Sequence, residues 1–220
     1  MKNLRLLHIF ILISVCFAFS LSVAYVPFDC GKALKTIFKN EGGYSSDPND
    51  TGNFCKINGK RVNLGTKYGI AASVYGPYLV KQGKTIKGLT VQDAAFFYNR
   101  DYAQPLHLSE IRSQWLATMF LDTAVNCGTG TAAILITRTI NVMNGKSEDF
   151  PVDPVVGKAE IDFINSFTES RWYEKEKDSS RRYLFGAVFK EMRARRYVQI
   201  VRRNPAMLRY LPTWMERTYN

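Results

Sequence analysis

Residues 40–50 read Asn40-Glu41-Gly42-Gly43-Tyr44-Ser45-Ser46-Asp47-Pro48-Asn49-Asp50, with an acid near each end of the segment. The residues before it predict a helix, because four apolar side chains recur at the helical period: Ala33, Leu34, Ile37 and Phe38. Glu41 continues this apolar stripe. Gly42 and Gly43 then end the helix, because glycine adopts the left-handed conformation of a helix C-cap without steric cost.

The position of Glu41 on an apolar stripe suggests a chemical role. Desolvation disfavours the charged form of a carboxylic acid and raises its pKa, which suits a group that donates a proton near neutral pH. The alternative is an ordinary capped helix end at which Glu41 turns back to solvent. Glu41 is therefore a candidate general acid, with this alternative left open.

Length and composition limit the class of protein. A chain of 220 residues fits one domain, or a main domain with a small appendage. With 46% hydrophobic and 13% aromatic residues, the composition favours a folded domain over intrinsic disorder. The formal charge of +11 favours an anionic partner such as nucleic acid, anionic lipid or an acidic cell-wall polymer.

Residues 1–24 predict an export signal. Lys2 and Arg5 precede a long uncharged run, and Ser22-Val23-Ala24 supplies the small residues that a signal peptidase requires. The alternative is a retained anchor, because the uncharged stretch extends to Val26 and is long enough to span a bilayer. In either case we expect an exported protein, periplasmic or secreted, that contacts the membrane only through this segment.

Four cysteines raise the question of disulfides. Cys16 lies in the export segment, and Cys30, Cys55 and Cys127 remain. Export permits a disulfide, but three thiols cannot all pair within one chain. We expect a Cys30–Cys55 bridge, because these two cysteines flank the Glu41 region.

The rest of the sequence predicts a mainly α fold (α+β) with one small β-hairpin after the first helix. Asn58-Gly59 favours a type I′ turn between two short strands. Asp29 and Thr90 are expected helix N-caps, the latter in a capping box with Asp93. Further helices are expected from Ser109, over 132–143, over 157–167 and over 180–203. A connector at 149–154 divides a region of residues 25–150 from a C-terminal helical region of residues 151–220.

The residue types in this sequence exclude most kinds of catalytic site. Of its two histidines, His8 belongs to the export segment and His107 stands alone, so no metal site is expected. A cysteine peptidase would pair His107 with Cys30, Cys55 or Cys127 and is a minor alternative. No Gly-rich phosphate loop follows a strand. Chemistry by two carboxylates remains.

Several motifs resemble the glycoside hydrolase family 108 muramidases, which are lysozymes of bacteria and phages. The motifs are Glu41-Gly42-Gly43-Tyr44, Asp47-Pro48-Asn49-Asp50 with Gly52, Thr66-Lys67-Tyr68-Gly69-Ile70, Leu89-Thr90 with Asp93-Ala94, Tyr98 with Tyr102, and Phe120-Leu121-Asp122-Thr123-Ala124-Val125-Asn126 with Gly128. Val152-Asp153, Val156-Gly157, Arg196-Tyr197, Asn204-Pro205 and Trp214 with Arg217 resemble the family's C-terminal peptidoglycan-binding region.

The resemblance implies a lysozyme-like helical domain that hydrolyses the β-1,4 bond between N-acetylmuramic acid and N-acetylglucosamine in peptidoglycan (EC 3.2.1.17). It implies Glu41, Asp50 and Thr66 as catalytic residues, with Asp47 as a rival second acid. Residues implied in substrate binding are Tyr44, Asp47, Tyr68 and Asn126. A glycosidase needs one acid to protonate the leaving oxygen and a second carboxylate to activate water or stabilise positive charge. We expect no cofactor, no nucleic acid partner and a monomer.

Two departures from the family pattern stand out. Residues 53–65 form an insertion between Gly52 and Thr66, where the family has about two residues. Pro154 replaces the glycine usual after the aspartate of the C-terminal region.

The second half of the chain leaves two questions open. Asp122 and Asn126 share a predicted helical face with Trp115, and either cap neighbouring loops or line a cleft; we favour a structural role for Asp122. Residues 180–203 carry eight Lys and Arg against one acid, Glu191. This helix is either a solvated basic face or a surface that attracts anionic cell wall. Tyr183, Tyr197 and Trp214 are expected in the core. The alternative function is a non-catalytic cationic protein that binds wall polymer or nucleic acid.

Overall fold

The structure is a computed structural model that describes residues 28–38, 43–146, 152, 154–169 and 179–219. The predicted export segment 1–24, with Cys16, lies outside the described residues, as do Glu41 and nearly all of the 149–154 connector. Within the described ranges, no helix combines the length and apolar character needed to cross a bilayer.

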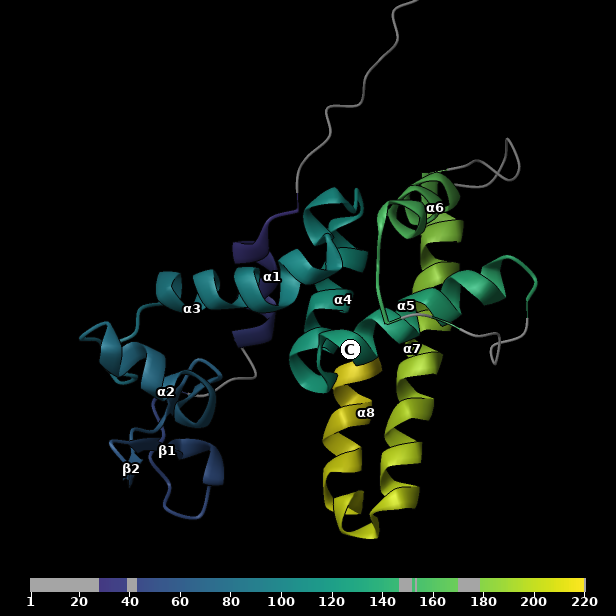
Figure 1. Cartoon of the computed structure of the whole chain (residues 1–220). Helices are drawn as coiled ribbons and strands as arrows, with labels where there is room; N and C mark the ends of the chain where they lie inside the picture. The colour runs from purple at the N-terminus through teal and green to yellow at the C-terminus, as the bar shows by residue number, and fades with distance from the viewer. Residues whose placement is uncertain (1–27, 39–42, 147–151, 153, 170–178, 220) are drawn as a thin grey trace, which may run out of the picture.

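The chain folds into a mainly helical molecule with one small β lobe, which confirms the predicted fold class. In Figure 1 the hairpin of β1 and β2 lies with α2 at one side, and α5, α6, α7 and α8 lie at the other. Helices α1, α3 and α4 lie between the two sides. The helices are α1 (Cys30–Phe38), α2 (Ala72–Lys81), α3 (Val91–Tyr98), α4 (Gln114–Cys127), α5 (Thr129–Met143), α6 (Lys158–Glu169), α7 (Ser179–Arg203) and α8 (Leu211–Tyr219).

The small lobe contains the predicted hairpin. Strands β1 (Phe54–Ile57) and β2 (Lys60–Asn63) pair antiparallel, with Cys55 opposite Val62. The turn residues Asn58 and Gly59 both have positive φ, 50° and 78°, as a type I′ turn requires. A second short pair, β3 (Thr66–Lys67) and β4 (Ile70–Ala71), leads into α2.

Local capping explains where several helices begin. The Asp29 side chain accepts a hydrogen bond from the Lys32 amide at 2.9 Å, and Thr90 and Asp93 form the predicted capping box. The helix expected from Ser109 begins instead at Gln114, with Ser113 as its N-cap. Residues Leu108–Glu110 form only a 3-10 turn, because the left-handed conformation of His107 (φ 51°) redirects the chain.

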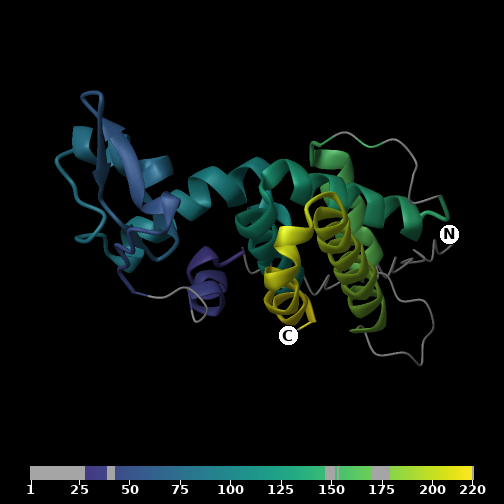
Figure 2. The ribbon, with the colours of Figure 1, turned by 90° about the horizontal axis from the view of Figure 1, so that it is seen from below.

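Helix α4 is the centre of the core and packs against α1, α5 and α7. Phe120 of α4 is fully buried between Phe185 and Phe189 of α7, with ring centroids 6.2 and 4.8 Å away. Figure 2 shows α1 between the β lobe and α8. The first helix itself packs against α4 and α3.

The expected Cys30–Cys55 disulfide is wrong, because Cys30, Cys55 and Cys127 are all free thiols. Cys55 is buried against α2, where a Cβ on Gly76 would lie only 2.6 Å from its Sγ. Cys30 instead begins α1 and packs at the edge of the core. The two cysteines thus serve different packing contacts.

Of the three aromatic residues expected in the core of the C-terminal region, only Tyr197 is fully buried. Tyr197 is buried and stacks on the half-buried Trp214, with ring centroids 5.0 Å apart. Tyr183 was predicted wrongly, because it is 57% exposed and packs against Trp115 of α4.

Candidate active site

Ser45 and Thr66 are brought together by an antiparallel β bridge. The Ser45 amide donates to the Thr66 carbonyl at 2.9 Å, and the Thr66 amide donates to the Ser45 carbonyl at 2.8 Å. The Thr66 Oγ1 atom is buried and has no hydrogen-bond partner among the described residues. The buried Thr66 hydroxyl is thus held beside the segment that follows Glu41 in the sequence.

Tyr44 lies directly over Gly65, the residue before Thr66. A Cβ on Gly65 would lie 2.5 Å from Tyr44 Cε2 and 2.6 Å from the Ser45 carbonyl oxygen, and Gly65 has φ +78°. Only glycine fits this position, for both conformational and steric reasons. The Tyr44 hydroxyl donates to the Leu64 carbonyl at 3.4 Å, and its ring remains 38% exposed. The tyrosine therefore supports the bridge and still offers a surface to solvent.

Asp47 and Asp50 lie in the exposed turn between Ser45 and the hairpin. Asp47 Oδ1 accepts two hydrogen bonds from Asn49, from the amide at 2.8 Å and from Nδ2 at 3.1 Å. Asp50 caps the 3-10 turn Thr51–Asn53, with Oδ1 accepting from the Gly52 amide at 2.8 Å. Its Oδ2 has no partner in the described part of the chain. Asp50 therefore keeps one carboxylate oxygen available.

The insertion of residues 53–65 holds this turn in place, which the sequence did not predict. Asn53 is fully buried, and its Nδ2 donates to the Asp47 carbonyl at 3.0 Å. Asn63 Nδ2 donates to the Ser46 carbonyl at 3.0 Å. Both asparagines lie at the ends of the insertion, so only its tip projects freely. The only sign of these two contacts in the sequence is that Asn53 and Asn63 flank the predicted hairpin.

Tyr68 is positioned by contacts of both its backbone and its ring. It has φ 51°, and its carbonyl accepts a hydrogen bond from the buried Tyr98 hydroxyl at 3.0 Å. Its ring lies 5.1 Å from Lys67 Nζ and packs partly against the core. These contacts fix the loop after Thr66.

Asn126 is half-buried in the last turn of α4. The structure thus gathers Tyr44, Asp47, Asp50, Thr66 and Tyr68 in the small lobe, whereas Asn126 lies on α4. Asp122, one turn before Asn126, is bound by two arginines, which is the structural role expected for it.

Asp101 is a further partly buried carboxylate, but its contacts assign it a structural role. Hydrogen bonds from Arg100 at 2.5 and 2.8 Å lower the pKa of Asp101. Its Oδ2 also accepts from the Tyr75 hydroxyl at 2.9 Å, and burial raises the pKa of Tyr75. Both carboxylate oxygens of Asp101 are therefore occupied.

The cysteine peptidase alternative has no support in the geometry. His107 Nδ1 lies 3.0 Å from Glu110 Oε1, and none of the cysteines in the described ranges contacts this ring. Burial raises the pKa of the Cys30 thiol to about 11, and burial also raises the pKa of Cys55. Cys127 Sγ contacts the Tyr197 hydroxyl at 3.6 Å. These thiols lack the base that a nucleophilic cysteine needs.

Comparisons with known proteins place these residues in context. A search of curated proteins finds no match. A solved structure, described as the structure of Brucella abortus SagA, is similar with a TM-score of 0.54 and 17% sequence identity, over 86% of this chain and 88% of that chain. This likeness concerns the fold. Residues 34–128, which include Glu41, Asp50 and Thr66, match the model of the family described as Glycosyl hydrolase 108.

Proposed function

We propose that this protein is a muramidase that hydrolyses the β-1,4 bond between N-acetylmuramic acid and N-acetylglucosamine. The observation that carries the proposal is the Ser45–Thr66 bridge, which holds the buried Thr66 hydroxyl beside the segment that follows Glu41. The match of residues 34–128 to Glycosyl hydrolase 108 supports a glycoside hydrolase.

The three proposed catalytic residues have distinct roles. Glu41 protonates the oxygen of the leaving sugar, and Asp50 either activates a water molecule or stabilises the positive charge that develops on the sugar ring. Thr66 orients the attacking water through its Oγ1. Asp50 is preferred over Asp47 because the resemblance to the family motif implies Asp50 as the second acid; each of the two carboxylates has its Oδ1 occupied by a local hydrogen bond. Tyr44 and Tyr68 flank Thr66 in the same lobe and would contact the glycan.

The proposed substrate implies where the protein acts. Peptidoglycan lies outside the cytoplasmic membrane, so residues 1–24 would export the chain as a cleaved signal or a retained anchor. We propose a monomer that requires no cofactor and uses no nucleic acid.

Digestion of purified peptidoglycan by the exported protein tests this function. Borohydride reduction of the products, followed by acid hydrolysis and mass spectrometry, identifies the sugar at each new reducing end. A muramidase yields reduced muramic acid, and this yield should fall by about 10²–10⁴-fold in Glu41→Gln. Glu191→Gln is a matched control, because Glu191 is exposed on α7 and pairs only with Arg195 among the described residues. Reduced glucosamine, or products without a reducing end, would refute the assigned bond.

The same digest tests the alternative of a non-catalytic cationic protein. Such a protein would bind the wall material and release no new reducing ends. Equal activity of Glu41→Gln and the native protein would instead show that the acid lies elsewhere.

A further inference from the structure

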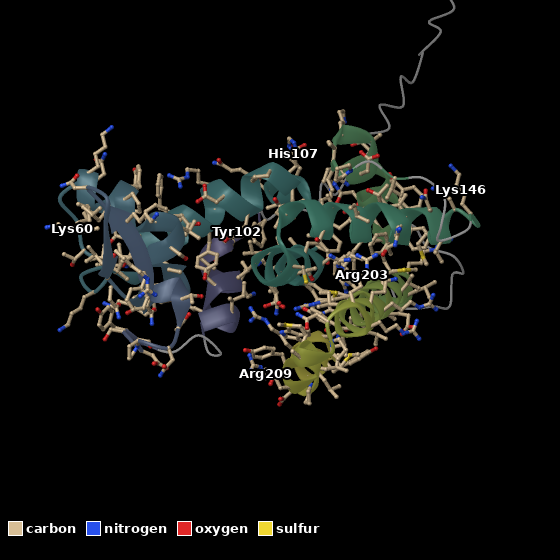
Figure 3. All side chains as sticks on the ribbon, turned by 60° about the horizontal axis from the view of Figure 1, so that its bottom comes forward. Lys60, Tyr102, His107, Lys146, Arg203 and Arg209 are labelled. Atoms are coloured by element: carbon tan, nitrogen blue, oxygen red, sulfur yellow. The ribbon has the colours of Figure 1, made fainter. Side chains whose placement is uncertain are left out.

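A cavity of about 1050 Å³ lies between α1, α4, α7 and α8, outside the lobe that holds Asp50 and Thr66. Lys32 and Ile37 contribute from α1, and Trp115 and Met119 from α4. Figure 3 shows α7 and α8 on the opposite side of the molecule from Lys60 of the hairpin. Ligand sites commonly have volumes of about 300–1,000 Å³, so this cavity can hold a ligand of several residues.

The charge of the cavity is strongly positive. Its walls carry two acids, Asp122 and Glu216, against six cations: Lys32, Arg112, Arg182, Lys190, Arg193 and Arg217. A concave surface lined by one sign of charge concentrates the field and attracts the opposite charge. The expected ligand is therefore anionic.

Arg193 contributes a hydrogen-bond donor for an anionic ligand to this positively charged cavity. Only 2% of the Arg193 side chain is exposed, and its Nη1 lies 2.7 Å from Asp122 Oδ2. Its Nε donates to the Tyr197 hydroxyl at 3.0 Å. The third nitrogen, Nη2, has no hydrogen-bond partner among the residues that the structure describes. A buried guanidinium nitrogen without a partner is costly, and a ligand oxygen would remove that cost.

The surrounding ion pairs leave an excess positive charge at this point. Arg217 Nε also donates to Asp122, through Oδ1 at 2.8 Å. One carboxylate thus serves two guanidinium groups, and the three side chains together carry one positive charge. An added carboxylate can pair with this charge and accept a hydrogen bond from Arg193 Nη2.

One wall of the cavity is aromatic. Trp115 and Tyr183 pack with ring centroids 5.4 Å apart and are 38% and 57% exposed. A Cβ on Gly186 would lie 2.2 Å from Trp115 Cη2, so glycine at this position of α7 is what admits the indole ring. This wall favours a ligand with apolar surface beside its charge, rather than a small inorganic anion.

We propose that this cavity binds the carboxylate-bearing peptide stem of peptidoglycan, next to the glycan that the small lobe engages. The proposal rests on the proposed function for its choice of ligand. A peptide stem combines several carboxylates with apolar side chains, as the six cations and the Trp115–Tyr183 wall require. Helix α1 forms part of the cavity and precedes the segment of the small lobe, so a stem and its own glycan strand can be held together.

Binding of the free stem peptide tests the proposal without requiring cleavage. The native protein is titrated with the soluble tetrapeptide stem and with the same peptide after amidation of its carboxylates, and binding is followed by calorimetry. We expect the double variant Lys32→Gln/Lys190→Gln and the amidation each to weaken binding by about ten-fold or more, since each removes charge pairing at the cavity. The matched control is Arg202→Gln/Arg203→Gln, with the same charge change on exposed residues at the far end of α7. Equal losses in both double variants would refute the site.

Two further measurements separate the proposal from other outcomes. Inorganic phosphate and phosphatidylglycerol vesicles are titrated in parallel, and binding of either one with the same dependence on Lys32 and Lys190 would overturn the choice of a peptide stem. On peptidoglycan, Lys32→Gln/Lys190→Gln should raise KM and leave kcat unchanged, whereas on glycan strands stripped of peptide both constants should be unchanged. Stem binding by a protein that cuts no glycan would refute the muramidase alone, and cleavage without stem binding would refute the cavity alone.

Discussion

Ser45 and Thr66 exchange two backbone hydrogen bonds, although 21 positions separate them in the sequence. The bridge orients Thr66 independently of its hydroxyl, because only backbone atoms form it. The role of the Thr66 side chain can therefore be tested separately from the fold.

Thr66→Val should affect stability and activity in opposite directions. Valine keeps the β-branched shape and removes Oγ1, which is buried without a partner among the described residues. Stability should be unchanged or slightly higher, because replacing an unsatisfied buried polar group by an apolar group is favourable. Peptidoglycan cleavage should fall on the order of 10²-fold if Oγ1 orients the water. Urea denaturation and initial rates measure both effects, and Thr66→Ser should restore activity. Full activity in the valine variant would remove Thr66 from the mechanism.

Gly65→Ala should destabilise the small lobe far more than Gly59→Ala. Both glycines have φ +78°, so both variants incur the roughly 1–2 kcal/mol of a left-handed non-glycine residue. At Gly59 a Cβ meets nothing within 4 Å, whereas at Gly65 it overlaps Tyr44 and the Ser45 carbonyl. The difference between the two free energies of unfolding isolates the steric contact. Equal values would mean that Tyr44 moves away without cost.

Shortening the hairpin tip should preserve cleavage. Removal of Lys56, Ile57, Lys60 and Arg61 joins the Asn58-Gly59 turn directly to the Cys55–Val62 pair and retains Asn53 and Asn63. We expect activity within about ten-fold and a changed preference among walls, because loops on a rigid scaffold adjust recognition. Loss of all activity in the shortened hairpin would show that the tip itself contacts substrate.

Asn53→Ala, in contrast to the shortened hairpin, should destabilise the lobe by about 1–3 kcal/mol, because it removes a buried hydrogen bond to the Asp47 carbonyl.

Asp122→Asn should be strongly destabilising. The substitution leaves Arg193, which is 1% exposed, without its counterion, and also removes the charge that binds Arg217. Breaking a buried ion pair by removal of one partner costs about 3–5 kcal/mol. Glu191→Gln removes an exposed pair with Arg195 and should cost less than about 1 kcal/mol. Chemical denaturation of both variants gives the comparison, and a small loss in Asp122→Asn would show that Arg193 finds another partner.

Cys30 should react slowly with iodoacetamide in the native protein. Burial is the main cause that raises its pKa from 9.0 to about 11, with the nearby Asp29 charge as the second cause. Because the folded state favours the neutral thiol, its contribution to stability is fully present below pH 9 and is lost as pH rises toward 11. Alkylation followed by peptide mapping should show faster labelling above pH 10, and equal rates for native and unfolded protein at pH 8 would contradict this. The same mapping without reductant should find no Cys30–Cys55 bridge.

Local features of this fold follow from the sequence alone. The Asn58-Gly59 turn, the Thr90–Asp93 capping box and the Asp29 cap depend on residues within four positions of one another. Their geometry is set by backbone conformation and short-range hydrogen bonds, so distant residues have little influence on them. The mainly helical class with one small hairpin follows for the same reason. The choice of Glu41, Asp50 and Thr66 came from sequence motifs and remains a prediction.

The contacts that organise the small lobe and the cavity depend on tertiary structure. Thr66 reaches Ser45, and Arg193 reaches Asp122, only because the chain folds back between them. Nothing in the sequence of residues 180–203 distinguishes the buried Arg193 from exposed basic residues such as Arg195. Which face of this basic helix is buried depends on the helices that pack against it. Cys55 likewise packs against Gly76 rather than reaching Cys30, because steric fit with α2 places it there. Non-local packing, which has no signature within a short window of sequence, determines these positions.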